Sequence, residues 1–123
     1  MYQFAFEKLE VWQEAKLLIR AVYQLTAKFP DYEKFGLTNQ LRRASTSVAA
    51  NLAEGSTRYT AKEQAYFSTI AYGSLIEVLN FIIIAVELGF ADENDLYLLR
   101  LKIQPLSLKI NNLRKSQSKR TKI

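Results

Sequence analysis

The stretch EKLEVWQEAKLLIRAVYQLTAKF, residues 7–29, decides the fold class. Its apolar residues recur at intervals of four, three, four, three and four, which places them on one face of an α-helix. The residues on this face are Val11, Ala15, Leu18, Val22, Leu25 and Phe29. Pro30 ends the helix because the residue before a proline is pushed out of the helical region. The pattern therefore predicts an amphipathic helix with one buried stripe.

Three more helices are predicted downstream of the first, over residues 37–55, 60–88 and 93–114. Thr60 and Glu63 have the spacing of a capping box at the start of the third helix. Short connections between helices of this length favour antiparallel neighbours. The predicted fold is therefore all-α, an up-and-down antiparallel four-helix bundle formed as one domain. The apolar line of the second helix is Leu37, Leu41, Ala44, Val48 and Leu52.

The fourth helix carries a regular heptad seam and leads into a basic tail. The seam consists of Leu96, Leu99, Ile103, Leu106, Ile110 and Leu113. Pro105 lies within it, so we expect a kink or a local loosening there. The apolar periodicity stops after about Arg114, and residues 114–123 are therefore predicted to be a basic, disordered tail on a bundle domain of residues 1–113.

Positive charge is concentrated at the C-terminal end of the chain. Six bases and no acid follow residue 108, whereas residues 1–108 hold eleven bases and twelve acids. The six bases are Lys109, Arg114, Lys115, Lys119, Arg120 and Lys122. Such a segment suits binding to nucleic acid, and it equally suits a solubility extension.

The composition argues against catalysis and against a membrane location. The chain has no cysteine and no histidine, so a catalytic triad, a zinc site and a disulfide framework are excluded. We expect no enzyme activity, no metal and no cofactor. The start of the chain has no signal-peptide pattern, and the apolar run from Leu75 to Leu88 is interrupted by Glu77 and Asn80. We therefore expect a cytoplasmic protein without a membrane span.

Several helices carry more apolar residues than one bundle core uses. One interpretation is a broad core with a few exposed leucines. The interpretation we prefer is a homo-oligomer that packs through the third and fourth helices, because monomers rarely expose large apolar patches. The third helix is apolar around most of its circumference at Leu79, Phe81, Ile82, Ile83, Ile84, Ala85 and Val86. The fourth helix adds a second line at Leu98, Leu101 and Leu108, and the first helix adds Leu9, Trp12, Ile19 and Tyr23.

A polar line runs beside the apolar one on the second helix. It consists of Arg43, Ser47, Asn51 and Glu54, and Ser74 and Glu77 lie one turn apart on the third helix. Charged side chains near a core must be paired, because burying a charge without a partner costs several kcal/mol. We expect a buried structural network in which Arg43 pairs with Glu77 or Glu54. The alternative is a ligand site or a catalytic carboxylate pair.

Arg42 is expected to point to a different surface from Arg43, because it lies one position further around the helix. There it could join Arg58 and Lys62 in a basic patch near one end of the bundle. An ordinary solvated face is the alternative. Together with the six C-terminal bases, these three residues are our candidates for nucleic-acid binding.

Motifs throughout the chain resemble a bacterial four-helix-bundle family that is encoded in intervening sequences of large-subunit ribosomal RNA genes. The resemblance covers about Phe4 to Leu113. It implies a bundle that assembles as a homopentameric barrel. It also implies kinship with the accessory variability protein of diversity-generating retroelements, which binds a reverse transcriptase and nucleic acid. The motif residues are Phe6-x-x-Leu9-x-Val11-Trp12, Phe29-Pro30, Gly36-Leu37-Thr38-x-Gln40-Leu41-Arg42-Arg43-Ala44, Ser47-x-x-x-Asn51-x-Ala53-Glu54-Gly55 and Ala71-x-Gly73-Ser74-x-x-Glu77.

Three functions follow from these features, in order of preference. The first is a non-catalytic oligomer that binds the RNA or DNA backbone by shape and charge, because the aromatic residues do not form an RNA-recognition motif. The second is a scaffold that docks a protein partner. The third is an enzyme built on Glu54 and Glu77.

Overall fold

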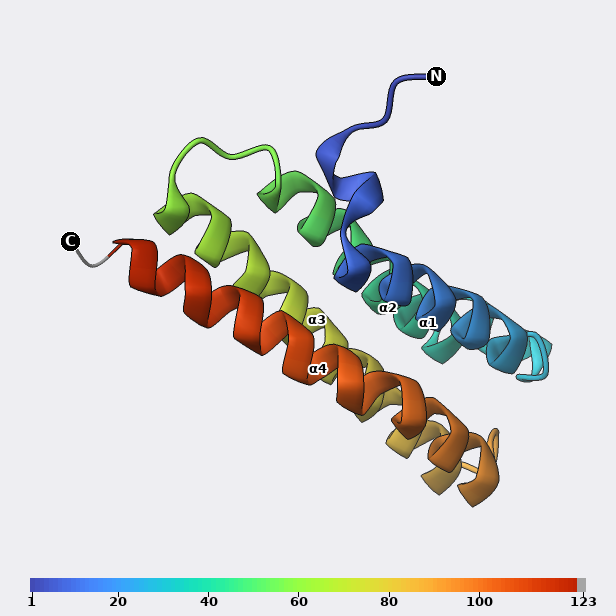
Figure 1. Cartoon of the computed structure of the whole chain (residues 1–123). Coiled ribbons are helices and arrows are strands. Elements are labelled where there is room, and N and C mark those ends of the chain that lie inside the picture. Colours follow the sequence, from blue (N-terminus) through green and yellow to red (C-terminus); the bar gives the residue numbers. More distant parts are fainter. Residues whose placement is uncertain (122–123) are drawn as a thin grey trace.

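The computed structural model describes residues 1–121, which form four α-helices and two short 3-10 helices and contain no strand. The α-helices are α1 (Glu10–Thr26), α2 (Leu37–Gly55), α3 (Ala61–Glu87) and α4 (Glu93–Thr121). The 3-10 helices are η1 (Ala5–Lys8), which precedes α1, and η2 (Asp31–Glu33), which precedes α2. Each helix packs on the next one, and α4 packs back on α1 (Figure 1). The predicted up-and-down four-helix bundle is confirmed.

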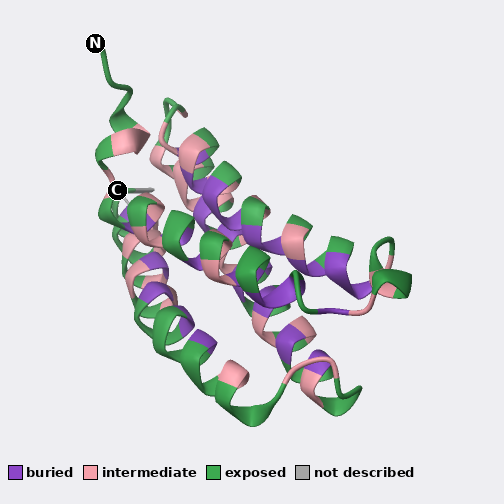
Figure 2. Cartoon of the chain, turned by 90° about the vertical axis from the view of Figure 1, so that its right-hand side faces the viewer, coloured by how far each residue is buried: buried purple, intermediate pink, exposed green. Residues whose placement is uncertain are grey.

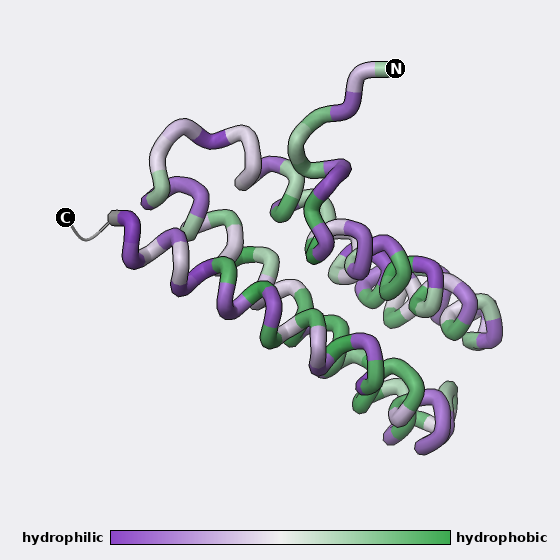
Figure 3. The backbone as a smooth tube through the Cα atoms, in the orientation of Figure 1, coloured by the Kyte–Doolittle hydropathy of each residue, from purple (hydrophilic) through white to green (hydrophobic). Residues whose placement is uncertain are grey.

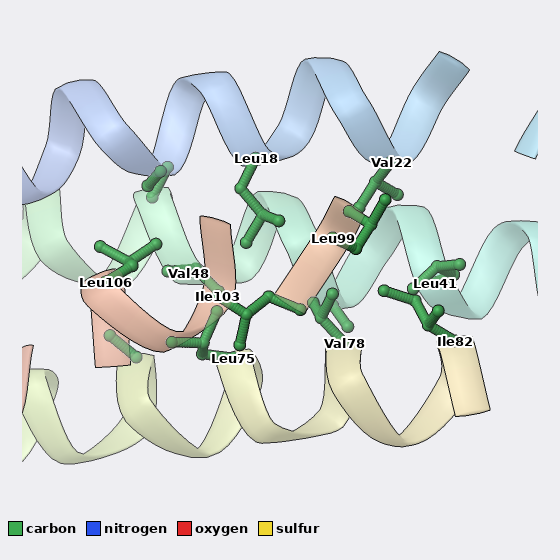
Figure 4. Packing of buried hydrophobic residues seen from close by; sticks show 14 of the residues in the cluster. Leu18, Val22, Leu41, Val48, Leu75, Val78, Ile82, Leu99, Ile103 and Leu106 are labelled. Atoms are coloured by element: carbon green, nitrogen blue, oxygen red, sulfur yellow. The ribbon is translucent and has the colours of Figure 1, made fainter. Parts of the chain in front are cut away.

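The core consists of the apolar stripes that the sequence predicts. Leu18 of α1, Val48 of α2 and Leu75 of α3 are fully buried and meet at the centre of the bundle together with Ile103 of α4 (Figure 4). All six residues of the predicted α1 stripe are buried, including Phe29 beyond the end of the helix. Buried residues accordingly form inward-facing stripes along the helices in Figure 2. The packing of these stripes sets the rotation of each helix about its own axis.

Side chains satisfy backbone groups at the starts of three helices. The Glu33 carboxylate accepts the Leu37 N–H at 2.7 Å and thereby caps α2. Thr60 Oγ1 accepts the Glu63 N–H at 3.1 Å, which confirms the predicted cap of α3. At α4, the Asp92 N–H donates to Asp95 and the Asp95 N–H donates to Asp92, at 3.0 and 2.8 Å. These bonds satisfy donors that the first turn of a helix leaves unpaired.

The fourth helix is longer than the sequence predicts. It continues through Pro105 and past the predicted end at residue 114 to Thr121. Gln117 is only 7% exposed and accepts a 2.7 Å hydrogen bond from Ser68 Oγ of α3. The expected disorder after Arg114 is therefore wrong as far as residue 121, because the last turns are held by polar contacts that apolar periodicity does not reveal. Residues 122 and 123, including the candidate Lys122, lie outside the described residues.

By length and composition alone, α3 is long and apolar enough to cross a membrane, although Glu77 and Asn80 interrupt its apolar run. In the structure it packs against α2 on one side and α4 on the other. Its buried residues Ala71, Leu75, Val78 and Ile82 belong to the shared core. In this arrangement α3 contributes one wall of the bundle core.

Candidate nucleic-acid interface

One end of the bundle carries a net positive charge. Here α2 ends and α3 begins, over residues 54–66, beside residues 114–120 of α4 (Figure 1). These two segments hold six bases and two acids, a net charge of +4. The last turns of α4 are hydrophilic in Figure 3. We call these two segments the basic end.

The opposite end of the bundle carries the opposite charge. Residues 28–35 connect α1 to α2, and residues 87–95 connect α3 to α4; together they hold two bases and six acids, a net charge of −4. An ion pair of 3.3 Å between Lys28 and Asp95 joins the two segments. The bundle is therefore electrically polarised along its length, and the basic end is the end that attracts anions.

Contacts between α3 and α4 build the basic end from segments far apart in sequence. Besides the bond from Ser68 to Gln117, an Arg120 Nη donates to Gln64 Oε1 at 2.9 Å. On the other side of α3, a Cβ added to Gly55 would lie only 2.9 Å from the Phe67 Cβ. Glycine at this position therefore allows the end of α2 to approach α3 closely.

Three of the predicted candidates are exposed lysines of the basic end. Lys62 lies in the first turn of α3, and Lys115 and Lys119 lie in the last turns of α4. Within residues 1–121, none of the three has a hydrogen-bond or ion-pair partner. Their ammonium groups are therefore available to an external anion.

Three arginine candidates at the same end are already engaged. Arg58 lies 4.4 Å over the Phe67 ring and 3.5 Å from Glu54, and its buried Nε has no hydrogen-bond partner. Arg114 lies 4.4 Å over the Tyr72 ring and donates to Asn111 at 2.7 Å. Arg120 is the residue that donates to Gln64. These arginines contribute positive potential, but their side chains also hold the bundle together.

Arg42 and Lys109 do not belong to the basic end. Arg42 Nε donates to Thr26 Oγ1 at 2.8 Å, and its guanidinium lies 4.4 Å over the Tyr23 ring. The predicted patch of Arg42 with Arg58 and Lys62 is therefore wrong, because Arg42 packs on α1. Lys109 bridges from α4 to α1 as well, as described next.

Lys109 binds two carboxylates of α1. Its Nζ lies 2.5 Å from Glu10 and 2.6 Å from Glu14. Hydrogen bonds to Glu10 and then to Glu14 raise the pKa of Lys109 above its ordinary value of 10.5, because they stabilise the charged ammonium. The charge of Lys109 is thus matched within the chain, and the residue serves helix packing.

Part of the predicted polar network forms between α2 and α3. Ser47 Oγ and Ser74 Oγ lie 2.9 Å apart, and Asn51 Nδ2 donates to both the backbone oxygen and the Oγ of Ser47, at 2.8 and 3.0 Å. The neutral members of the line are thus brought together. A structural network of this kind fixes how two helices align.

The charged members of that line do not join the network. Arg43, Glu54 and Glu77 are exposed, and Glu54 faces Arg58. Arg43 and Glu77 line the same surface groove between α2 and α3, yet no ion pair joins them within residues 1–121. The predicted pairing of Arg43 with Glu77 or Glu54 is wrong, because exposed side chains need no partner to offset desolvation.

Sequence reasoning missed two tyrosines at the basic end. Tyr59 is fully exposed in the connection before α3, and Tyr66 is 62% exposed. The spacing Tyr-x-x-Lys-x-x-x-Tyr around Lys62 was the signal that could have revealed them. Exposed aromatic rings beside bases are a common feature of surfaces that bind single-stranded nucleic acid.

Comparison with known protein families finds one family that matches most of the chain. A family described as 23S rRNA-intervening sequence protein matches residues 7–112, which span α1, α2, α3 and most of α4. The chain belongs to this family. The resemblance of the sequence motifs to this family is confirmed, and the matched residues include Ser47, Asn51 and Ser74. A search of curated proteins finds no match.

The limits of the family match bear on the basic end. Residues 54–66 lie within the matched part, whereas Arg114, Lys115, Lys119 and Arg120 lie beyond residue 112. The α3 half of the basic end thus belongs to the family region, and the α4 half lies outside it.

Proposed function

We propose that this protein is a non-catalytic helical bundle that binds the sugar-phosphate backbone of nucleic acid through its basic end. The observation that carries the proposal is the net positive charge of the basic end, where Lys62, Lys115 and Lys119 are exposed and unpaired within residues 1–121. Two of these lysines come from α4 and one from α3, so the fold places them at the same end of the bundle.

Lysine ammonium groups bind phosphates as point charges and do not read sequence. Binding of this kind releases counterions and weakens as salt concentration rises. The acidic opposite end repels phosphate and thereby orients the bundle with its basic end toward the strand. We expect salt-dependent binding with little preference for sequence.

The test compares two triple variants with the same change in net charge. The first, Lys62→Gln with Lys115→Gln and Lys119→Gln, removes the unpaired lysines of the basic end. The second, Lys16→Gln with Lys34→Gln and Lys102→Gln, removes exposed lysines elsewhere. If each lysine of the first set contacts one phosphate, the slope of log affinity against log salt falls by about 2 to 3 in that variant alone. Fluorescence anisotropy with labelled oligonucleotides measures both slopes.

Two results would overturn this function. One is wild-type binding by the first variant. The other is an equal loss in both variants, which would mean that only total charge matters. Both variants should remain folded, because all six residues are exposed. Melting curves followed by circular dichroism check this.

We further propose that the protein self-associates through α3 and α4. Both helices expose large apolar side chains, with Ile76 at 44% and Ile83 at 42% on α3 and Leu101 at 55% and Leu108 at 59% on α4. Association would remove this surface from water and combine several basic ends in one particle. The motif resemblance implies five copies, and native mass spectrometry measures the number directly.

The same apolar surface favours a second candidate function, a scaffold that docks a protein partner. The two functions are separated by capture from a lysate of the native host treated with nuclease. A nucleic-acid-binding protein loses its bound material under nuclease, whereas a scaffold retains its protein partner. Retention of one protein by the Leu101→Gln, Leu108→Gln variant would show that this surface is not the docking site.

A further inference from the structure

We propose that Tyr59 and Tyr66 form a stacking site for unpaired bases, so that the nucleic acid bound at the basic end is single-stranded. This inference rests on the proposed function and names the class of ligand. The sequence led us to expect that the protein recognises nucleic acid by shape and charge alone, whereas stacking adds direct contact with the bases.

The two rings project into solvent from a fixed part of the fold. Tyr59 is fully exposed and directly precedes Thr60, whose side chain caps α3. Tyr66 is 62% exposed and meets Phe67 edge to face, with ring centroids 5.5 Å apart. The Arg58 guanidinium lies on the Phe67 ring at 4.4 Å. The segment that carries the tyrosines is thus anchored, while much of each ring stays uncovered.

A cation lies between the two tyrosines in the sequence. Lys62 and Tyr66 are four residues apart on α3, so they are neighbours on one face of the helix. Tyr59 lies three residues before Lys62. A single strand presents bases and phosphates in alternation, and it can stack its bases on the rings while its phosphates meet Lys62.

Three other exposed aromatic residues lie beside acidic residues. Tyr32 and Phe35 lie at the acidic end beside Asp31 and Glu33, and Tyr97 follows Glu93 and Asp95 in α4. Negative charge there repels phosphate. The N-terminal segment with its own exposed rings extends away from the bundle (Figure 1).

Stacking selects single strands over duplexes for a geometric reason. The bases of a duplex stack on one another, and their faces are open only at its ends. An unpaired strand exposes the faces of all its bases, and every base has such a face. The site therefore favours single-stranded RNA or DNA without requiring a defined sequence.

The experiment measures the affinity of the full chain for a labelled single strand of about 20 nucleotides and for a blunt duplex of the same sequence. We expect wild type to prefer the single strand. Tyr59→Ala with Tyr66→Ala should weaken single-strand binding by about tenfold or more and leave duplex binding unchanged, because stacking contributes roughly 1–3 kcal/mol per base. The Tyr59→Phe, Tyr66→Phe variant keeps the rings and should bind within about twofold of wild type. Tyr97→Ala is the control at the acidic end and should have no effect.

The outcomes separate this inference from the function on which it rests. If the triple lysine variant weakens binding but the double alanine variant binds single strands like wild type, stacking is overturned and the proposed function stands. Failure of the phenylalanine variant to retain affinity would also overturn stacking, since the rings remain. If wild type binds neither probe, both proposals are wrong.

Discussion

Leu17 and Leu18 are consecutive residues of α1 with opposite environments. Leu18 is fully buried in the core, whereas Leu17 is 53% exposed. Replacing Leu18 by Ala removes buried methyl groups and leaves a cavity, so we expect a loss of about 2–5 kcal/mol in the free energy of unfolding. Leu17→Ala should change it by less than about 0.5 kcal/mol. Urea unfolding followed by circular dichroism measures both, and equal losses would contradict the assigned rotation of α1.

Single residues also decide how the positive charge is used. Lys109 and Lys115 lie six positions apart on α4, yet one binds Glu10 and Glu14 of α1 and the other is exposed without a partner in residues 1–121. The difference follows from the side of α4 on which each lies. A count of bases therefore overestimates the charge that this chain offers to a ligand.

At the scale of the helix, the end of α3 depends on Gly89. Its φ of +80° lies in the left-handed region, and the Phe90 N–H donates to the Ala85 oxygen at 2.8 Å. The Gly89 N–H donates to the Val86 oxygen at 3.1 Å, which completes a Schellman motif.

Two glycine substitutions should act in opposite directions. Gly89→Ala forces a Cβ into the left-handed conformation and should cost about 1–2 kcal/mol. Gly73 lies in the exposed interior of α3, where an added Cβ would meet nothing within 4 Å. Gly73→Ala should therefore stabilise the protein by about 0.5–1 kcal/mol. Thermal unfolding compares the two, and a stabilised Gly89→Ala variant would contradict the geometry of this turn.

Asp95, in the first turn of α4, should make the stability of the protein depend on pH. The backbone N–H of Asp92 and then the ammonium of Lys28 lower the pKa of Asp95 below its ordinary value of 3.8, against an opposing effect of burial. The folded state thus binds this proton more weakly than the unfolded state. The stabilisation is present above pH 3.8 and is lost as the pH falls through the lower folded pKa.

Asp95→Asn should therefore be less stable than wild type at about pH 7, and the difference should shrink at about pH 3. Glu93→Gln makes the same charge change two residues away and should show no such convergence, because the Glu93 side chain makes no hydrogen bond within residues 1–121. Urea midpoints at both pH values provide the comparison. A constant difference between Asp95→Asn and wild type would refute the assignment.

At the scale of the whole molecule, self-association should depend on the outer face of α4. Leu101 and Leu108 are a heptad apart and share that face, and both are more than half exposed. The double variant Leu101→Gln, Leu108→Gln should have a lower molar mass in solution than wild type. Its thermal unfolding should remain cooperative, because both residues lie outside the bundle core. Leu17→Gln on α1, at a similar exposure, should leave the mass unchanged. Light scattering at micromolar concentration measures the mass, and a monomeric wild type would refute self-association.

Most of the fold could be predicted from the sequence, but only part of the candidate site could. The stripes from Val11 to Phe29 and from Leu96 to Leu113 correctly indicated helices and core, because periodicity is a local property of the chain. Arg42 was misplaced because its partner Thr26 lies on another helix. The last turns of α4 were missed because Gln117 is held by Ser68, a polar residue 49 positions away.

Spacing along the chain and short connections are enough to predict the four amphipathic helices, their antiparallel order and the Ser47 and Asn51 line on α2. The docking of α4 on α3, by contrast, brings the start of α3 beside the end of α4 and so creates the basic end. The tertiary structure also decided which cations are matched within the chain. The physical reason is that such pairings depend on how each helix is rotated and docked against its neighbours, and the packing of the whole core sets that rotation.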